Sequence, residues 1–159
     1  MTVLLQGAAL GIAATAVMDL WNLLLRRTAG IASLNYCHLG RWVMHLPTGR
    51  VVHRPIADSP PRPAECAVGW LAHGSIGAVL GTTFLLLHPG WAAHPTALPA
   101  IGFGVATVVL PFAILQPALG LGLAARRARA PWRARAKSVT THLVFGTGLW
   151  LAAMIAAGW

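Results

Sequence analysis

Four long apolar stretches constrain this chain more than any other feature of its sequence. They cover residues 3–25, 67–87, 98–125 and 139–157, and together they contain one formal charge, that of Asp19. A helix needs about 20 mainly apolar residues to cross a bilayer core. The sequence therefore predicts an all-α integral membrane protein with four transmembrane helices in an antiparallel bundle. We expect the whole chain, residues 1–159, to form a single membrane domain.

The composition supports this class and excludes others. Charged residues make up 9% of the chain, whereas soluble domains carry about 25%. The mean hydropathy is +0.67. An ordinary soluble globule, a disordered tail and a free nucleic-acid-binding module are all excluded, because too little polar chain remains to cover four apolar helices.

The basic residues indicate how the helices cross the membrane. All 12 Lys and Arg lie in two segments, 26–66 and 126–138, which follow the first and third apolar stretches. Short loops rich in Lys and Arg stay in the cytoplasm. Both segments should lie on the same side of a four-span protein, so we predict cytoplasmic basic loops and both termini outside.

The net charge of +9 points to lipid in this setting, with no nucleic-acid partner. A Lys or Arg beside an anionic membrane surface contributes about 1 kcal/mol. We expect the second basic segment to contact anionic lipid headgroups through Arg126, Arg127, Arg129, Arg133, Arg135 and Lys137.

The two cysteines, Cys37 and Cys66, both lie in the first basic loop. On the predicted topology this loop is cytoplasmic, so both residues are expected to be reduced thiols. His38, His45 and His53 share the loop, but no CxxC or HxxxH spacing supports a metal site there.

Four polar side chains within the apolar stretches are predicted to form one intramembrane layer. Asp19, His73 and His142 lie five to eight residues from the charged ends of their stretches, or roughly 8–12 Å along a helix. Gln116 is slightly deeper, ten residues before Arg126. Ionisable groups in a span usually face protein, so we expect this layer to be the binding site of the molecule.

Three functions are open for this layer. It could be a hydrogen-bond network that sets helix register. It could hold a metal, with Asp19, His73 and His142 as ligands of Zn, Fe or Cu, or bind haem through two histidines. It could also be a proton or ion pathway that uses Asp19 with a histidine partner.

The sequence favours a non-enzymatic protein, because it has only three carboxylates and no nucleophile elbow or phosphate loop. We interpret it as a polytopic membrane protein whose polar intramembrane site binds a metal, haem or proton, or fixes the packing of a partner subunit. The alternative is a small transporter or ion-coupled carrier. That alternative requires a homo-oligomer, since four helices are few for a transport path within one chain.

Several runs resemble one protein family over nearly the whole chain. They include Met18-Asp19-Leu20-Trp21, Gly40-Arg41-Trp42, Gly69-Trp70 with His73, Gln116-Pro117, and Thr141-His142 with Phe145-Gly146. The chain resembles small bacterial inner-membrane proteins that are known only as a domain of unknown function. This resemblance implies a multi-span protein of the bacterial inner membrane and implies no activity.

Overall fold

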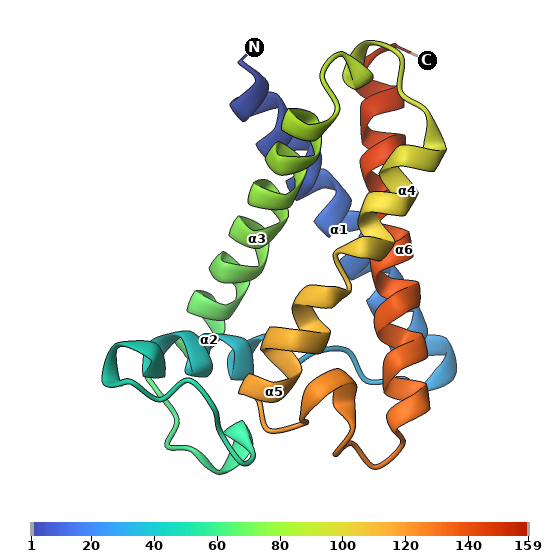
Figure 1. Cartoon of the computed structure of the whole chain (residues 1–159). Coiled ribbons are helices and arrows are strands. Elements are labelled where there is room, and N and C mark those ends of the chain that lie inside the picture. The colour runs from blue at the N-terminus through green and yellow to red at the C-terminus, as the bar shows by residue number, and fades with distance from the viewer. Residues whose placement is uncertain (1, 159) are drawn as a thin grey trace. The chain divides into compact units, whose positions relative to one another are not determined.

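The computed structural model describes residues 2–158, and every regular element in this range is a helix (Figure 1). The prediction of an all-α protein with four membrane spans is confirmed. Four helices are long and apolar enough to cross a membrane: Val3–Ala29, Glu65–Leu87, Ala97–Ala118 and Pro131–Ala156.

Three of these spans are continuous α-helices, and the third is interrupted. The continuous helices are α1 (Val3–Ala29), α3 (Glu65–Leu87) and α6 (Pro131–Ala156). The third span consists of α4 (Ala97–Ala106), a π-helical segment η4 (Pro111–Leu115) and the short α5 (Gln116–Ala118). Proline has no backbone N–H to donate, so the helical ladder is broken at Pro111 and the backbone widens there.

The ends of the helices differ from the prediction in two places. The third apolar stretch runs to residue 125, but its helix ends at Ala118. Gly120 and Gly122 follow with φ angles of 96° and 73°, a backbone region that favours glycine and ends a helix. The fourth helix begins at Pro131 instead of residue 139, because proline fits the first turn, where its missing N–H is not needed.

The described residues fall into two compact units. Unit 1 contains residues 2–33, 74–107 and 139–158, and unit 2 contains residues 34–73 and 108–138. The single domain expected from the sequence stays a prediction.

In unit 1, glycines bring α1 and α3 into contact. A Cβ on Gly11 would overlap the carbonyl of Gly77, and a Cβ on Gly81 would lie 2.6 Å from the backbone nitrogen of Gly11. Small residues of this kind let membrane helices approach closely. The two helices run antiparallel, since Gly7 near the start of α1 meets Gly81 near the end of α3.

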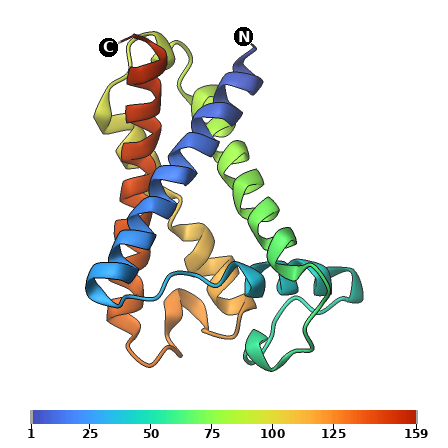
Figure 2. The same ribbon diagram turned by 180° about the vertical axis from the view of Figure 1, so that it is seen from behind.

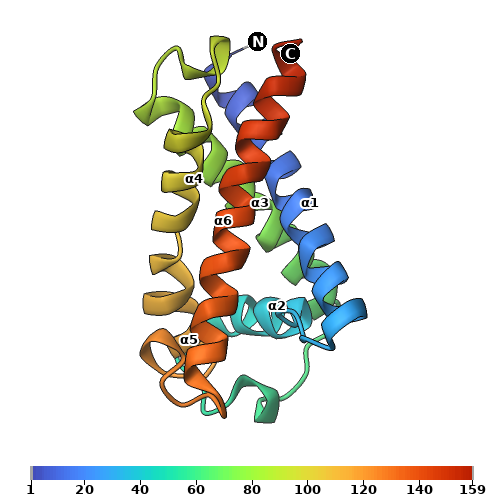
Figure 3. The same ribbon diagram turned by 90° about the vertical axis from the view of Figure 1, so that its right-hand side faces the viewer.

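Unit 1 also packs α6 against α1 and α4. Gly148 of α6 lies against Ala14 of α1, and Gly146 lies against Ala100 of α4 (Figures 2 and 3). A 3-10 turn, η3 (Trp91–Ala93), connects α3 to α4, and the Trp91 ring packs edge-on against Phe84 at 4.7 Å. Buried apolar side chains fill the centre of this bundle: Leu10, Ala14, Phe84, Leu85, Trp91, Ala100, Phe145, Leu149 and Ala153.

Unit 2 is built around the first basic loop, which is ordered. It contains α2 (Tyr36–His45) and the 3-10 turns η1 (Leu46–Thr48), η2 (Ile56–Asp58) and η5 (Leu123–Ala125). The loop is tied to the end of α5 by two backbone bonds, from His53 N to Ala118 O at 2.9 Å and from Ile56 N to Leu119 O at 3.2 Å. The loop therefore has a defined conformation.

Candidate functional site

His142 of α6 is hydrogen-bonded to the end of α4. Its Nδ1 lies 2.8 Å from Oγ1 of Thr107, and the same hydroxyl donates to the carbonyl of Gly104 at 2.6 Å. A threonine hydroxyl has one proton to donate, so Nδ1 of His142 is the donor in the first bond. The imidazole thus links two helices within unit 1.

Asp19 lies on α1 in the same unit and is half-buried. Asn22, three residues further on, is 7% exposed, and its Oδ1 accepts a hydrogen bond from Thr141 Oγ1 at 3.4 Å. Residues three apart share a helix face. Asn22 was not among the predicted site residues, although a polar amide inside an apolar stretch is a usable signal.

His73 of α3 contacts Tyr36 of α2 in unit 2. The Tyr36 hydroxyl lies 3.0 Å from His73 Nε2, and the two rings stack with centroids 4.3 Å apart. The Trp70 ring also lies 4.3 Å from the Tyr36 ring. His73 therefore joins an aromatic cluster where α2 crosses the beginning of α3.

Gln116 of α5 is also in unit 2 and is 8% exposed. Its Nε2 donates to Ser138 Oγ at 3.1 Å, whereas its Oε1 is buried without a hydrogen-bond partner. A buried amide oxygen without a partner is uncommon in folded proteins.

The predicted layer is divided between the two units. Asp19 and His142 belong to unit 1, and His73 and Gln116 belong to unit 2. Within residues 2–158, no group of three or more His, Cys, Asp or Glu is arranged to hold a metal ion. A common layer of these four side chains stays a prediction.

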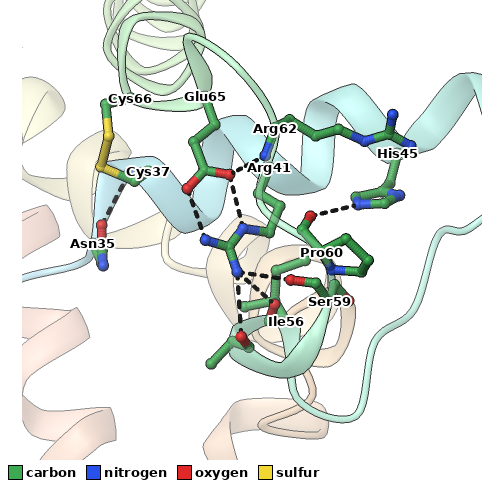
Figure 4. Close-up of polar contacts among 11 residues, drawn as sticks. Asn35, Cys37, Arg41, His45, Ile56, Ser59, Pro60, Arg62, Glu65 and Cys66 are labelled. Carbon is green, nitrogen blue, oxygen red and sulfur yellow. Dashed lines mark hydrogen bonds and ion pairs between the residues drawn. A yellow bond between two sulfur atoms is a disulfide. The ribbon is translucent and has the colours of Figure 1, made fainter.

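The most extensive polar contact in unit 2 is an ion pair between Arg41 of α2 and Glu65 of α3 (Figure 4). Arg41 Nε donates to Glu65 Oε2 at 2.8 Å, and Nη2 donates to Oε1 at 2.7 Å. The remaining nitrogen, Nη1, donates to the carbonyls of Ile56, Ala57 and Ser59 at 3.4, 3.2 and 2.9 Å. One guanidinium thus holds together α2, the beginning of α3 and the loop between them.

The surroundings of Arg41 account for its charge state. The two hydrogen bonds that Arg41 donates to Glu65 raise the pKa of Arg41 above its ordinary value, while partial burial acts in the opposite direction. Arg41 is 8% exposed, so it does not serve as a solvated headgroup ligand. From the sequence, Arg41 was expected only to be one of the charges of a basic loop.

The expectation of two reduced thiols is wrong, because Cys37 and Cys66 form a disulfide (Figure 4). The residues are 29 apart in sequence, and the packing of α2 on the first turn of α3 brings them together. The compartment of a loop does not determine which of its cysteines pack together. The disulfide also removes both sulfurs from any metal site with the loop histidines.

Two buried histidines lie beside the ion pair. The ring centroids of His45 and His53 are 5.3 Å apart, and the residues are 2% and 5% exposed. His53 Nδ1 is 2.7 Å from Ser59 Oγ, and His45 Nε2 is 3.5 Å from the carbonyl of Pro60. The other nitrogen of each ring is buried without a hydrogen-bond partner. Burial lowers the pKa of His53 below its ordinary value; the Arg50 backbone acts in the opposite direction, and the charges of His45 and Arg50 lower this pKa further.

The second basic segment is partly helical. Arg133, Arg135 and Lys137 lie in the first turns of α6, and Arg135 Nε donates to the carbonyl of Ala124 at 2.8 Å. The five arginines of the segment are exposed, and Lys137 is half-buried.

A family model described as "Protein of unknown function (DUF2938)" matches residues 8–156. The chain belongs to this family. No curated protein and no solved structure matches the chain. Membership agrees with the resemblance found in the sequence.

The matched range of the family contains the Arg41–Glu65 ion pair, the Cys37–Cys66 disulfide and all four residues of the predicted layer. The family description assigns no activity, so the proposals that follow depend on the geometry of these contacts.

Proposed function

We propose that the protein is a non-enzymatic membrane protein whose polar side chains fix the packing of its helices and of a partner subunit. The observation that carries this proposal is the hydrogen bond between His142 and Thr107. It engages one of the three ionisable side chains of the apolar stretches, His142, in a contact between helices. A packing function requires this kind of contact.

Other polar side chains support the same function. Asn22 contacts Thr141 between α1 and α6, and Tyr36 contacts His73 between α2 and α3. Such contacts contribute about 0.6 kcal/mol each in a membrane. Their main effect would be to select one register of the helices, since their summed free energy is small compared with the free energy contributed by the packing of the apolar side chains.

Metal, haem or proton binding has less support from the structure. A metal would need Asp19, His73 and His142 as ligands, and residues 2–158 hold no group of three such side chains in suitable positions. A proton pathway would use Asp19 with a histidine partner. We therefore place helix packing first and treat a bound metal or haem as an outcome that would overturn it.

We further propose that the protein lies in the inner membrane of a bacterium, with both termini outside. The support is the confinement of all Lys and Arg to residues 26–66 and 126–138. The exposed arginines 126, 127, 129, 133 and 135 would then reach anionic headgroups of the cytoplasmic leaflet.

The partner subunit could be a second copy of this chain. A homo-oligomer would also be required for the alternative function, a small carrier. Native mass spectrometry that shows only monomers in mild detergent would contradict both the self-partner and the carrier.

The packing function is tested with Thr107→Val and His142→Ala. If the pair links the helices, both variants lower the melting temperature of the purified protein, and the double variant is no less stable than the worse single variant. Thr147→Val is the matched control, because Thr147 is also half-buried but bonds within its own helix to the carbonyl of Leu143. A Soret band or stoichiometric metal in the wild type that His142→Ala removes would overturn the proposal.

A further inference from the structure

The junction of α2 and α3 has two cross-links side by side (Figure 4). Cys37 and Arg41 are four residues apart on α2 and so lie on one helix face. Their partners, Cys66 and Glu65, are neighbours at the beginning of α3. The disulfide and the ion pair therefore connect one face of α2, at positions one helical turn apart, to the first two residues of α3.

The position of α2 on α3 does not depend on the disulfide alone. A Cβ on Gly40 would overlap the carbonyl of Glu65, and a Cβ on Gly69 would overlap the carbonyl of Tyr36. This backbone contact would remain if the disulfide were reduced. The two thiols would then stay close to each other, which is what reversible oxidation requires.

The two cysteines of the disulfide differ in exposure. Cys66 is an exposed residue and Cys37 is half-buried. Thiol–disulfide exchange needs an attacking thiolate to reach one sulfur of the bond. Cys66 is therefore the sulfur at which an external thiol would attack.

The location of this pair is in conflict with a permanent disulfide. The loop that contains it carries six of the 12 basic residues of the chain, and such loops lie in the reducing cytoplasm. Disulfides that form there are usually transient or redox-sensing. A Cys37–Cys66 disulfide that forms and breaks agrees with the basic charge of the loop and with the close contact between α2 and α3.

We propose that Cys37 and Cys66 are a reversible thiol–disulfide switch, operated by a cytoplasmic dithiol protein of the thioredoxin class. This inference rests on the membrane orientation given under the proposed function.

In reduction, a thiolate of the dithiol protein attacks Cys66 Sγ, and Cys37 leaves as a thiolate that takes up a proton. The second thiol of the dithiol protein then attacks the mixed disulfide and releases Cys66. Two electrons pass to the cysteine pair, and the dithiol protein becomes a disulfide. Glutathione disulfide, or the oxidised dithiol protein, carries out the reverse reaction.

The switch would act on the loop through Arg41. The Nη1 atom of Arg41 holds the carbonyls of Ile56, Ala57 and Ser59. Opening the disulfide releases the first turn of α2, which carries Cys37, and so weakens the hold of Arg41 on Glu65 and on the loop. The amides of His53 and Ile56, which bond to Ala118 and Leu119, should then exchange with solvent more readily.

The first experiment traps the thiol state in living cells. Cells are quenched with acid, and denatured protein is labelled with a maleimide that adds mass on a gel. The switch predicts two labels in unstressed cells, none after an oxidant such as diamide, and a return to two labels during recovery. Cys37→Ser supplies the one-label standard. An unlabelled protein in unstressed cells, or two labels throughout the oxidant treatment, would overturn the switch.

The second experiment measures the effect on the loop. Hydrogen exchange of the purified full-length protein is compared in the oxidised and reduced forms. We expect exchange at His53 and Ile56 to be about tenfold faster after reduction. The Cys37→Ser, Cys66→Ser double variant should match the reduced form in either buffer. Equal exchange in the oxidised and reduced wild type would overturn the coupling of the switch to the loop.

A separate measurement distinguishes failure of the switch from failure of the orientation. A membrane-impermeant maleimide is applied to right-side-out and inverted vesicles after reduction. Labelling only in inverted vesicles supports the cytoplasmic loop. Labelling only in right-side-out vesicles overturns both the orientation and the switch, while the packing function of His142 and Thr107 is still tested by its own variants.

Discussion

Gly104 of α4 and Gly146 of α6 are in direct backbone contact, since a Cβ on Gly104 would lie 2.6 Å from the Cα of Gly146. The first prediction follows from this contact. Gly104→Ala forces the two helices apart and should destabilise the protein by about 1–3 kcal/mol, as overpacking does in a tight core. The measurement is the free energy of unfolding in a denaturing detergent titration.

Gly102→Ala is the control for this variant. Gly102 lies on the same helix, and a Cβ there would meet nothing within 4 Å. Alanine is favoured over glycine in a helix, so Gly102→Ala should be neutral or more stable by up to about 1 kcal/mol. Equal destabilisation by both variants would show that the glycine contact is not the cause.

The second prediction concerns the ion pair in unit 2. Arg41→Ala removes the guanidinium from Glu65, which still accepts a hydrogen bond from the Arg62 amide, and from the carbonyls of Ile56, Ala57 and Ser59. Removal of one member of a buried pair destabilises a protein by about 3–5 kcal/mol. We expect the loop to become sensitive to trypsin after Arg50, which can be followed by mass spectrometry.

Arg54→Ala is the matched control, because Arg54 is an exposed arginine of the same loop. Surface substitutions usually change stability by no more than about 0.5 kcal/mol. If Arg54→Ala opens the loop as much as Arg41→Ala does, the loss of net charge explains the effect and the ion pair does not.

The third prediction is a pH dependence of the loop. Because the pKa of His53 is lower in the folded protein than in the unfolded chain, the unfolded chain binds more protons in the intervening pH range. The stability contributed by neutral His53 is complete above about pH 6.5 and is lost as the pH falls below this value. Hydrogen exchange at Ile56, corrected for its intrinsic pH dependence, should reveal a loss of at most about 1.4 kcal/mol per pH unit.

His53→Gln tests the origin of this dependence. The glutamine side chain does not titrate but can still bond to Ser59, the partner of His53. The variant should exchange at the same corrected rate at pH 7.5 and pH 5.5. A pH dependence that survives in the variant would assign the effect to another group.

The fourth prediction concerns lipid. Replacement of Arg126, Arg127 and Arg129 by glutamine removes three exposed charges, each of which contributes about 1 kcal/mol next to an anionic surface. Native mass spectrometry should detect less bound phosphatidylglycerol in the variant than in the wild type, and equal retention of neutral lipid. If the variant binds as much phosphatidylglycerol as the wild type does, other residues make the headgroup contacts.

The number of spans could be predicted from the sequence, whereas their ends could not. Apolar length fixes the spans because no water satisfies backbone groups inside a bilayer. The end of the third span is decided by backbone conformation at Gly120, which hydropathy does not register. The helix α6 begins at Pro131, before the apolar stretch, because a helix can continue beyond the apolar layer, where basic side chains such as Arg133 are tolerated.

The polar contacts were predicted only in part. Individual side chains such as His142 stand out within apolar stretches, but their partners do not. Arg41 and Glu65 are 24 residues apart, and no local pattern pairs them. One signal was present, since Glu65 is one of only three carboxylates in a chain with a net charge of +9. A scarce carboxylate at the beginning of a span is a candidate for a buried pair.

The glycine contact between α1 and α3 affects how the protein assembles. Gly7, Gly11, Gly77 and Gly81 have no rotamers to lose when the helices meet, so this joint forms with almost no penalty in side-chain entropy. Its attraction comes from many weak dispersion contacts between backbones, which fall off steeply with separation. A single added methyl group within the joint would therefore hold the two helices apart and weaken most of these contacts at once.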